Sequence, residues 1–312
     1  MPSALLGLGC LLVFAVSQAV RDTYFGSVFQ SVSFFLIAIL AFGGSTLVFG
    51  LWALCRNRRQ IRTLIDHAGL LFALNTTTAA AWIMFFFALK NLEPAIVSTL
   101  YTGIGPTAVL AFSALGLAMA KRTDIGRFEF VGHCGVLASL IAIAVVAVLG
   151  QSGLSGPSVE TRLAAVVLAI AGGVLITVGH MIARRLGDLG VGSVALMGLR
   201  FPLTLGIAAV AEFSLDHNLP QPNVETLPLL AAAAFALIVI PSFFLQLGIA
   251  RTSPLTVNVI RALGPAFVFA AQQFDGRLHF SGGTLACILA FVLFEILAST
   301  TRGWQEARGL PR

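Results

Sequence analysis

Two charged side chains, Arg261 and Glu295, lie inside long apolar stretches of the sequence. A charge deep in a bilayer costs several kcal/mol, so an apolar segment that keeps one usually has a use for it. The turn between the two stretches centres near residue 278, which places both charges at similar depth if the stretches are antiparallel helices. We therefore expect an ion pair. Two interpretations stay open: a structural pair of compensating charges, or a coupling pair that opens when substrate or a proton binds.

Two similar stretches supply partners for this arginine. The segments NLEPAIVSTL (91–100) and RTSPLTVNVI (251–260) are offset by 160 residues, and this offset aligns Ser98 with Asn258 and Tyr101 with Arg261. Residues three apart share one face of a helix. We predict that these four side chains line one chamber. Arginine holds a carboxylate through two parallel hydrogen bonds, which favours a zwitterionic or carboxylate-bearing ligand.

Other polar residues inside apolar stretches are weaker candidates. An amide or hydroxyl in a membrane helix often bonds to its own backbone, so a purely structural use stays open for each. His133 and His180 are interpreted as bystanders, although a histidine pKa suits proton transfer. Gln18, Arg21 and Asp22 are interpreted as an outer gate. The further predicted substrate-binding residues are Arg200, Asn75, Trp82 and Gln246.

The composition assigns these residues to a membrane protein. Of 312 residues, 58% are hydrophobic and 10% are charged, whereas a soluble domain is about a quarter charged. The net charge of +6 comes without the interleaved aromatic and basic residues of a nucleic-acid binder. The four cysteines show no metal-ligand spacing. We expect a small-molecule substrate and membrane lipid as partners, no nucleic acid, no metal and no cofactor; a homodimer is left open.

Ten apolar stretches are long enough to span a bilayer as helices. Their length and lack of alternation argue against strands, so the predicted class is an all-α membrane protein. Five spans fall in residues 1–150 and five in 151–312, and an odd number makes two such repeats inverted. The first stretch has no basic residue before it and is interpreted as a span, not a signal peptide. The spans are 4–20, 31–54, 67–89, 94–119, 128–150, 162–183, 193–214, 226–249, 254–274 and 281–300.

The basic residues between the spans predict the orientation. With the N-terminus inside, 13 Lys and Arg residues fall in inner segments and 4 in outer ones. The Arg-rich stretch 55–62 and the segment with Lys121 and Arg122 are both inner, and both are interpreted as breaks between spans. Because basic residues accumulate on the cytoplasmic side, we expect both termini in the cytoplasm and the chain in the cell inner membrane.

In this pattern, with NLEPAIVSTL and RTSPLTVNVI each opening the fourth helix of a half, the chain resembles the EamA-like branch of the drug/metabolite transporter superfamily. The resemblance covers nearly the whole chain and implies ten helices in two inverted halves. It also implies transport, usually export, of small polar metabolites such as amino acids or amino-acid-derived metallophores. An acidic residue that often follows the fourth helix in that family is replaced here by Lys121-Arg122; Asp275 stands in for it in the second half.

The sequence carries no GxSxG, HExxH or GxxxxGK[ST] motif, so we expect neither an enzyme nor an ATP-driven pump. The leading expectation is a secondary transporter that exports a small amino-acid-like or carboxylate-bearing metabolite by alternating access. One alternative is a lipid or lipid-linked sugar translocase, with Arg200 and Arg261 holding the headgroup. The other is a non-transporting membrane sensor or scaffold, for which the short loops offer little surface.

Overall fold

The computed structural model describes residues 2–115, 126–214, 222–249, 251–252 and 254–307, and these residues form helices with no strand. Lys121, Arg122, Arg308 and Arg312, which entered the count of basic residues, lie outside the described residues. In chain order the elements are α1 (Pro2–Val28), α2 (Phe34–Arg56), α3 (Arg58–Asp66), α4 (Ala68–Asn91), α5 (Pro94–Ala114), α6 (Arg127–Val148), α7 (Val159–Asp188), α8 (Ser193–Leu199), α9 (Pro202–Ser214), η1 (Val224–Thr226), α10 (Leu227–Ala234), η2 (Phe235–Val239), α11 (Ile240–Ile249), α12 (Pro254–Gln272) and α13 (Gly282–Ala307).

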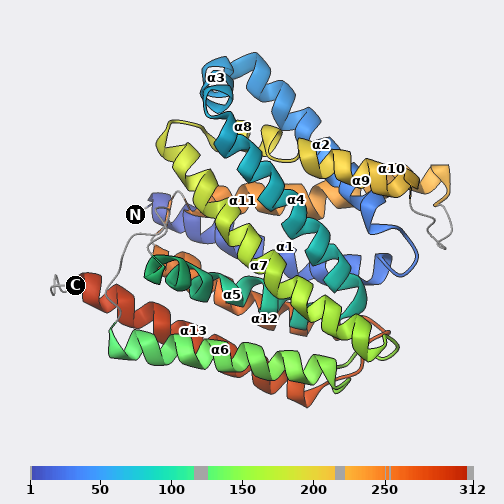
Figure 1. Cartoon of the computed structure of the whole chain (residues 1–312), viewed down its shortest axis with the longest axis vertical. Helices are drawn as coiled ribbons and strands as arrows, with labels where there is room; N and C mark the ends of the chain where they lie inside the picture. The colour runs from blue at the N-terminus through green and yellow to red at the C-terminus, as the bar shows by residue number, and fades with distance from the viewer. Residues whose placement is uncertain (1, 116–125, 215–221, 250, 253, 308–312) are drawn as a thin grey trace.

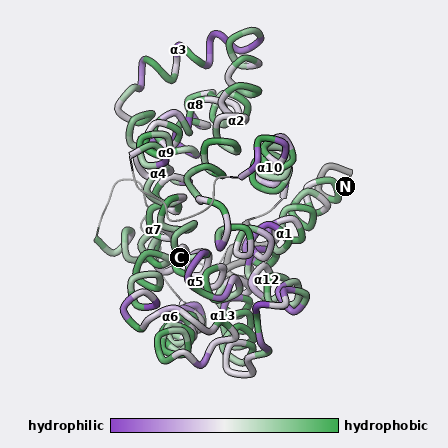
Figure 2. Tube along the Cα trace, turned by 90° about the vertical axis from the view of Figure 1, so that its right-hand side faces the viewer, coloured by the Kyte–Doolittle hydropathy of each residue, from purple (hydrophilic) through white to green (hydrophobic). Residues whose placement is uncertain are grey.

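The described chain has the character of a multi-pass membrane protein. Nine of its helical stretches are long and apolar enough to cross a bilayer. They match the expected spans except 254–274, which forms the 19-residue helix α12 and is not among the nine. Large apolar side chains face outward: Phe72 is 68% exposed and Leu293 is 66% exposed. Figure 2 shows the same hydrophobic character along most of the tube. Such an apolar exterior suits lipid and not water.

The Arg-rich stretch 55–62 does more than break the chain between two spans. Most of it belongs to α3, a short helix that was not predicted from the sequence. Leu64 is completely buried on one face, while Arg58, Arg59 and Arg62 are exposed on the other. The segment is an amphipathic helix, with an apolar face packed on the bundle and a charged face opposite.

The expected seventh span, 193–214, is a helix broken in two. Arg200 and Phe201 separate α8 from α9, because Pro202 lacks an N–H and disfavours the helical conformation in the residue before it. Asn75 on α4 satisfies backbone groups at the break. Its amide donates to the Leu199 carbonyl (2.9 Å), and its carbonyl accepts from the Leu203 N–H (3.2 Å). The eighth span contains a π-helical segment, Phe235–Val239.

Helices from the first half of the chain pack against helices from the second half. The first helix, α1, packs against α11 and α12, while α7 packs against α4 and α5. Three further pairings join early and late helices: α2 with α8 and α9, α5 with α12, and α6 with α13. Glycine allows the closest approaches. A methyl group at Gly173 would lie 2.4 Å from the Tyr101 carbonyl oxygen, and one at Gly198 would lie 2.6 Å from the Gly50 nitrogen.

The helices run between two ends of the bundle. Figure 1 shows that α1 begins, α6 begins, α7 ends and α13 ends at the same side, which we call the terminal end. The loops between α4 and α5, α6 and α7, and α12 and α13 lie at the opposite end (Figure 1). The first helix therefore begins at the same end of the bundle at which the last helix finishes.

Candidate functional site

A cavity of about 300 Å³ lies between α5, α6, α7, α12 and α13, in the half of the bundle nearer the terminal end. Two of its lining residues, Arg184 and Asn258, are exposed, so the described residues leave the cavity open on this side. The polar residues that line it are Thr102, Glu129, His133, Thr177, His180, Arg184, Asn258, Arg261, Glu295 and Ser299.

Three of the predicted site residues meet in this cavity: Asn258, Arg261 and Glu295. The guanidinium of Arg261 and the carboxylate of Glu295 lie within electrostatic range of each other, from α12 and α13. Glu295 is 4% exposed, and its Oε2 atom has no hydrogen-bond partner. The two predicted charges therefore line one cavity, and among the described residues the Oε2 atom is a buried acceptor without a donor.

Charges of both signs line the cavity, each from a different helix. Arg184 comes from α7 and Arg261 from α12, and His180 also lies on α7. Glu129 comes from α6 and Glu295 from α13, and His133 Nε2 on α6 lies 3.9 Å from Glu129 Oε1. Such a lining can hold a small molecule that has a negative and a positive group. Glu129 and Arg184 were not among the predicted site residues; the four-residue spacing of Glu129 and His133 on one helix was the available signal.

The other half of the predicted quartet lies elsewhere. Ser98 is completely buried and accepts a hydrogen bond from Gln18 Nε2 (3.2 Å) on α1. The Tyr101 ring packs on Phe85 at 4.7 Å between centroids, and its buried hydroxyl has no hydrogen-bond partner. Neither residue is among those lining the cavity, because Ser98 bonds to α1 and the Tyr101 ring packs against Phe85 of α4 and beside Gly172 of α7. One position further, Thr102 faces the cavity.

The remaining predicted binding residues also lie outside the cavity lining. Arg200, at the break between α8 and α9, is buried and donates to Thr78 Oγ1 (3.3 Å). The Asn75 side chain is hydrogen-bonded to the backbone at that break. Trp82 is buried among phenylalanines, 5.2 Å from Phe42 between ring centroids. Gln246 is half-buried on α11.

A second group of buried charges lies on α1. Arg21 is 7% exposed and Asp22 is fully buried, and the Arg21 guanidinium approaches Asp22 Oδ1 to 2.7 Å. The guanidinium carbon lies over two rings of α4, 5.5 Å from the centroid of Trp82 and 5.2 Å from that of Phe85. Cation–π contacts of this kind help to keep a buried arginine charged. The predicted gate residues thus form a compact cluster with Ser98.

At the end opposite the cavity, a hydrogen-bond network joins several loops around Glu93, a residue that the sequence marks only as part of the loop before Pro94. Glu93 Oε2 accepts from the Gly153 N–H (2.8 Å) and from Thr284 Oγ1 (3.1 Å). Glu93 Oε1 accepts from Gln272 Nε2, and Gln272 Oε1 accepts from the Ala95 N–H (3.0 Å). Burial raises the pKa of Glu93, and these hydrogen bonds lower it only in part.

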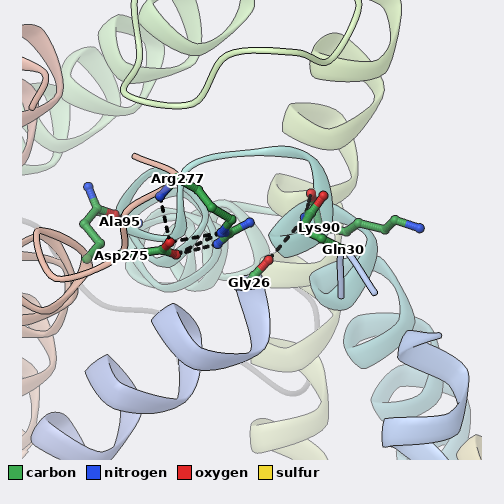
Figure 3. Close-up of polar contacts among 7 residues, drawn as sticks. Gly26, Gln30, Lys90, Ala95, Asp275 and Arg277 are labelled. Carbon is green, nitrogen blue, oxygen red and sulfur yellow. Dashed lines mark hydrogen bonds and ion pairs between the residues drawn. The ribbon is translucent and has the colours of Figure 1, made fainter. Parts of the chain in front are cut away.

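Further contacts tie the same end together (Figure 3). Gln30 Nε2, just after α1, donates to the Lys90 carbonyl at the end of α4 (2.8 Å) and to the Gly26 carbonyl. Arg277 pairs with Asp275 in the α12–α13 loop at 2.5 Å. Hydrogen bonds and an ion pair thus gather in the loops at this end of the bundle, whereas the cavity lies nearer the terminal end.

Comparisons with known proteins establish the fold alone. No protein-family model and no curated protein matches the sequence. A crystal structure of another protein aligns with 100% of this chain and 99% of its own chain, with a TM-score of 0.63 and 18% sequence identity. The whole chain therefore has a fold that is found in a solved structure, and at this identity the likeness carries no information on substrate.

Proposed function

We propose that the chain is a secondary transporter of the inner membrane that exports a small zwitterionic or carboxylate-bearing metabolite by alternating access. The observation that carries the proposal is the asymmetry of the bundle. A charged cavity is open near the terminal end, and hydrogen bonds around Glu93 join the loops at the opposite end. A transporter resting with one side open needs both features.

The packing of the helices supports the inverted repeat that the proposal requires. If residues 1–150 and 151–312 are two inverted halves, α7 is the counterpart of α1, and α4–α5 that of α11–α12. The contact of α1 with α11 and α12 then has its mirror in the contact of α7 with α4 and α5. The pairs α5–α12 and α6–α13 join equivalent helices. Repeats of this kind enclose a substrate site near the bilayer midplane in many transporters. The resemblance to the drug/metabolite transporter superfamily agrees with this arrangement.

The charges of the cavity support an amino-acid-like substrate. Arg261 would hold a carboxylate, and Glu295 with its unpartnered oxygen would accept an ammonium group. A free amino acid or an amino-acid-derived metallophore has both groups. A translocase that holds a headgroup between Arg200 and Arg261 receives less support, because Arg200 does not line the cavity.

Uptake of radiolabelled L-amino acids into everted membrane vesicles tests the proposal. We expect saturable uptake by the wild-type protein, since the cavity would face the external medium. Arg261→Ala removes charge-assisted hydrogen bonds of about 1.5–3 kcal/mol, so the half-saturating concentration should rise by about 10- to 100-fold. Arg185→Ala, an exposed arginine that does not line the cavity, is the matched control. Wild-type uptake by the Arg261→Ala protein would remove this residue from the substrate site.

A further inference from the structure

We infer that Arg21 and Asp22 form a second binding station for the transported solute, on the side of the bundle centre away from the cavity. The inference rests on the proposed transport function and deepens it. At this station the carboxylate of the solute would bind Arg21, and its ammonium group would bind Asp22. The internal ion pair would take the place of the solute while this side is closed.

The first support is that the ion pair is incomplete. Two nitrogens of Arg21, Nε and Nη2, both approach one oxygen of Asp22, Oδ1, at 2.7 Å. Gln18 also lies within hydrogen-bond range of the Asp22 side chain, but the other oxygen, Oδ2, is buried and has no hydrogen-bond partner among the described residues. A buried ion pair that serves only stability is expected to satisfy its remaining lone pairs, because an unpaired polar atom costs about 1–3 kcal/mol. This oxygen would accept the ammonium group of the solute once the cluster opens.

The second support is the set of groups around the pair. Trp82 and Phe85 provide aromatic faces beside the Arg21 guanidinium. Gln18 and Ser98 bond to each other next to the pair. The Tyr101 hydroxyl has no hydrogen-bond partner and lies within electrostatic range of Arg21. Hydroxyls, an amide and aromatic faces around a few charges are typical of sites for small polar ligands.

The third support is the position of the cluster along α5. Glu93, which lies at the far end, directly precedes this helix. Ser98 and Tyr101 then face the α1 cluster, and Thr102 and Gly105 face the open cavity. The hydrogen-bond network around Glu93, the charge pair and the cavity thus follow one another along a single helix. A solute that leaves the cavity toward the far end passes the charge pair before it reaches this network.

Thiol accessibility tests the station without a known solute. In a protein whose four cysteines are replaced by serine, Ser98→Cys should react with a membrane-impermeant maleimide added to intact cells. Thr99→Cys is the matched control: both native residues are completely buried, but the Thr99 hydroxyl donates to the Ala95 carbonyl of its own helix (2.6 Å). Labelling of Ser98→Cys no faster than Thr99→Cys would overturn the inference, because the cluster would then never open to the outer medium.

Charge exchange separates the station from a structural ion pair. The double variant Arg21→Asp with Asp22→Arg keeps a neighbouring pair of opposite charges in the same segment. We expect it to lose at least 10-fold in uptake of radiolabelled L-amino acids, measured per amount of folded protein in the membrane. Wild-type uptake by the exchanged protein would show that the pair is structural and would overturn the inference. If the wild-type protein itself takes up no amino acid, the proposed function fails, and thiol labelling still decides whether this cluster opens.

Discussion

Replacing Glu93 by alanine should destabilise the protein strongly, although the residue lies in a short loop between two helices. The substitution removes the acceptor of three buried hydrogen bonds, from Gly153, Gln272 and Thr284. Thr284 can still donate to Ser281 Oγ, which lies 3.0 Å away. Two donors are then left without a partner. At about 1–3 kcal/mol for each, together with the space left by the side chain, the cost is about 3–5 kcal/mol.

Thermal unfolding of the purified protein in detergent measures this loss. With about 2–4 °C per kcal/mol, the midpoint should fall by roughly 6–20 °C. Glu225→Ala removes an exposed carboxylate and is the control for the loss of a charge. If Glu93→Ala unfolds at the same temperature as Glu225→Ala, the hydrogen bonds to Glu93 do not hold the far end closed.

Three further predictions concern the same framework. Because burial raises the pKa of Glu93, the folded protein binds more protons than the unfolded chain just above the usual carboxylate range. Thermal stability should therefore fall as pH rises through that window, and the slope should disappear in Glu93→Gln. Gly173→Leu should abolish recovery of folded protein from membranes, since even a methyl group would lie 2.4 Å from the Tyr101 carbonyl oxygen; Gly187→Leu on the same helix, where nothing lies within 4 Å, should be tolerated. Asn75→Leu should lower the unfolding midpoint by several degrees through loss of its bonds to Leu199 and Leu203, whereas Thr76→Val, which loses only a bond to its own helix, should change it little.

The sequence predicted the helices well because the bilayer imposes one dominant rule. A run of about 20 apolar residues must satisfy its backbone internally, so it forms a helix whatever its neighbours are. Helix breaks and short helices between the spans depend on local interactions that a hydropathy pattern does not include. The break before Pro202 needed Asn75 from another helix to satisfy its backbone. The amphipathic helix α3 was not predicted, because its many arginines were interpreted as a break between two spans.

The candidate site was predicted only in part, because the direction of a side chain depends on how a helix is rotated and on what packs beside it. Arg261 was expected to pair with Glu295 and to share a chamber with Asn258, and all three line one cavity. Ser98 and Tyr101 were expected to join them, but Ser98 bonds to α1 and the Tyr101 ring packs against α4 and α7. The role of Glu93 could not be predicted, because in the sequence it is a single acidic residue in a loop. Its importance comes from Gln272 and Thr284, about 180 and 190 residues away in the chain.

The packing of α1 against helices of the second half has a consequence for biogenesis. This helix leaves the ribosome first. Its partners α11 and α12 are synthesised much later, and only α13 follows them. At about 5–20 residues per second, the interval of roughly 200 residues lasts about 10–40 s. During that time the Arg21–Asp22 segment is in the membrane without its final neighbours. An insertase or chaperone that shelters the first helix until synthesis ends would meet this need, and chains truncated after the first half should be degraded rapidly.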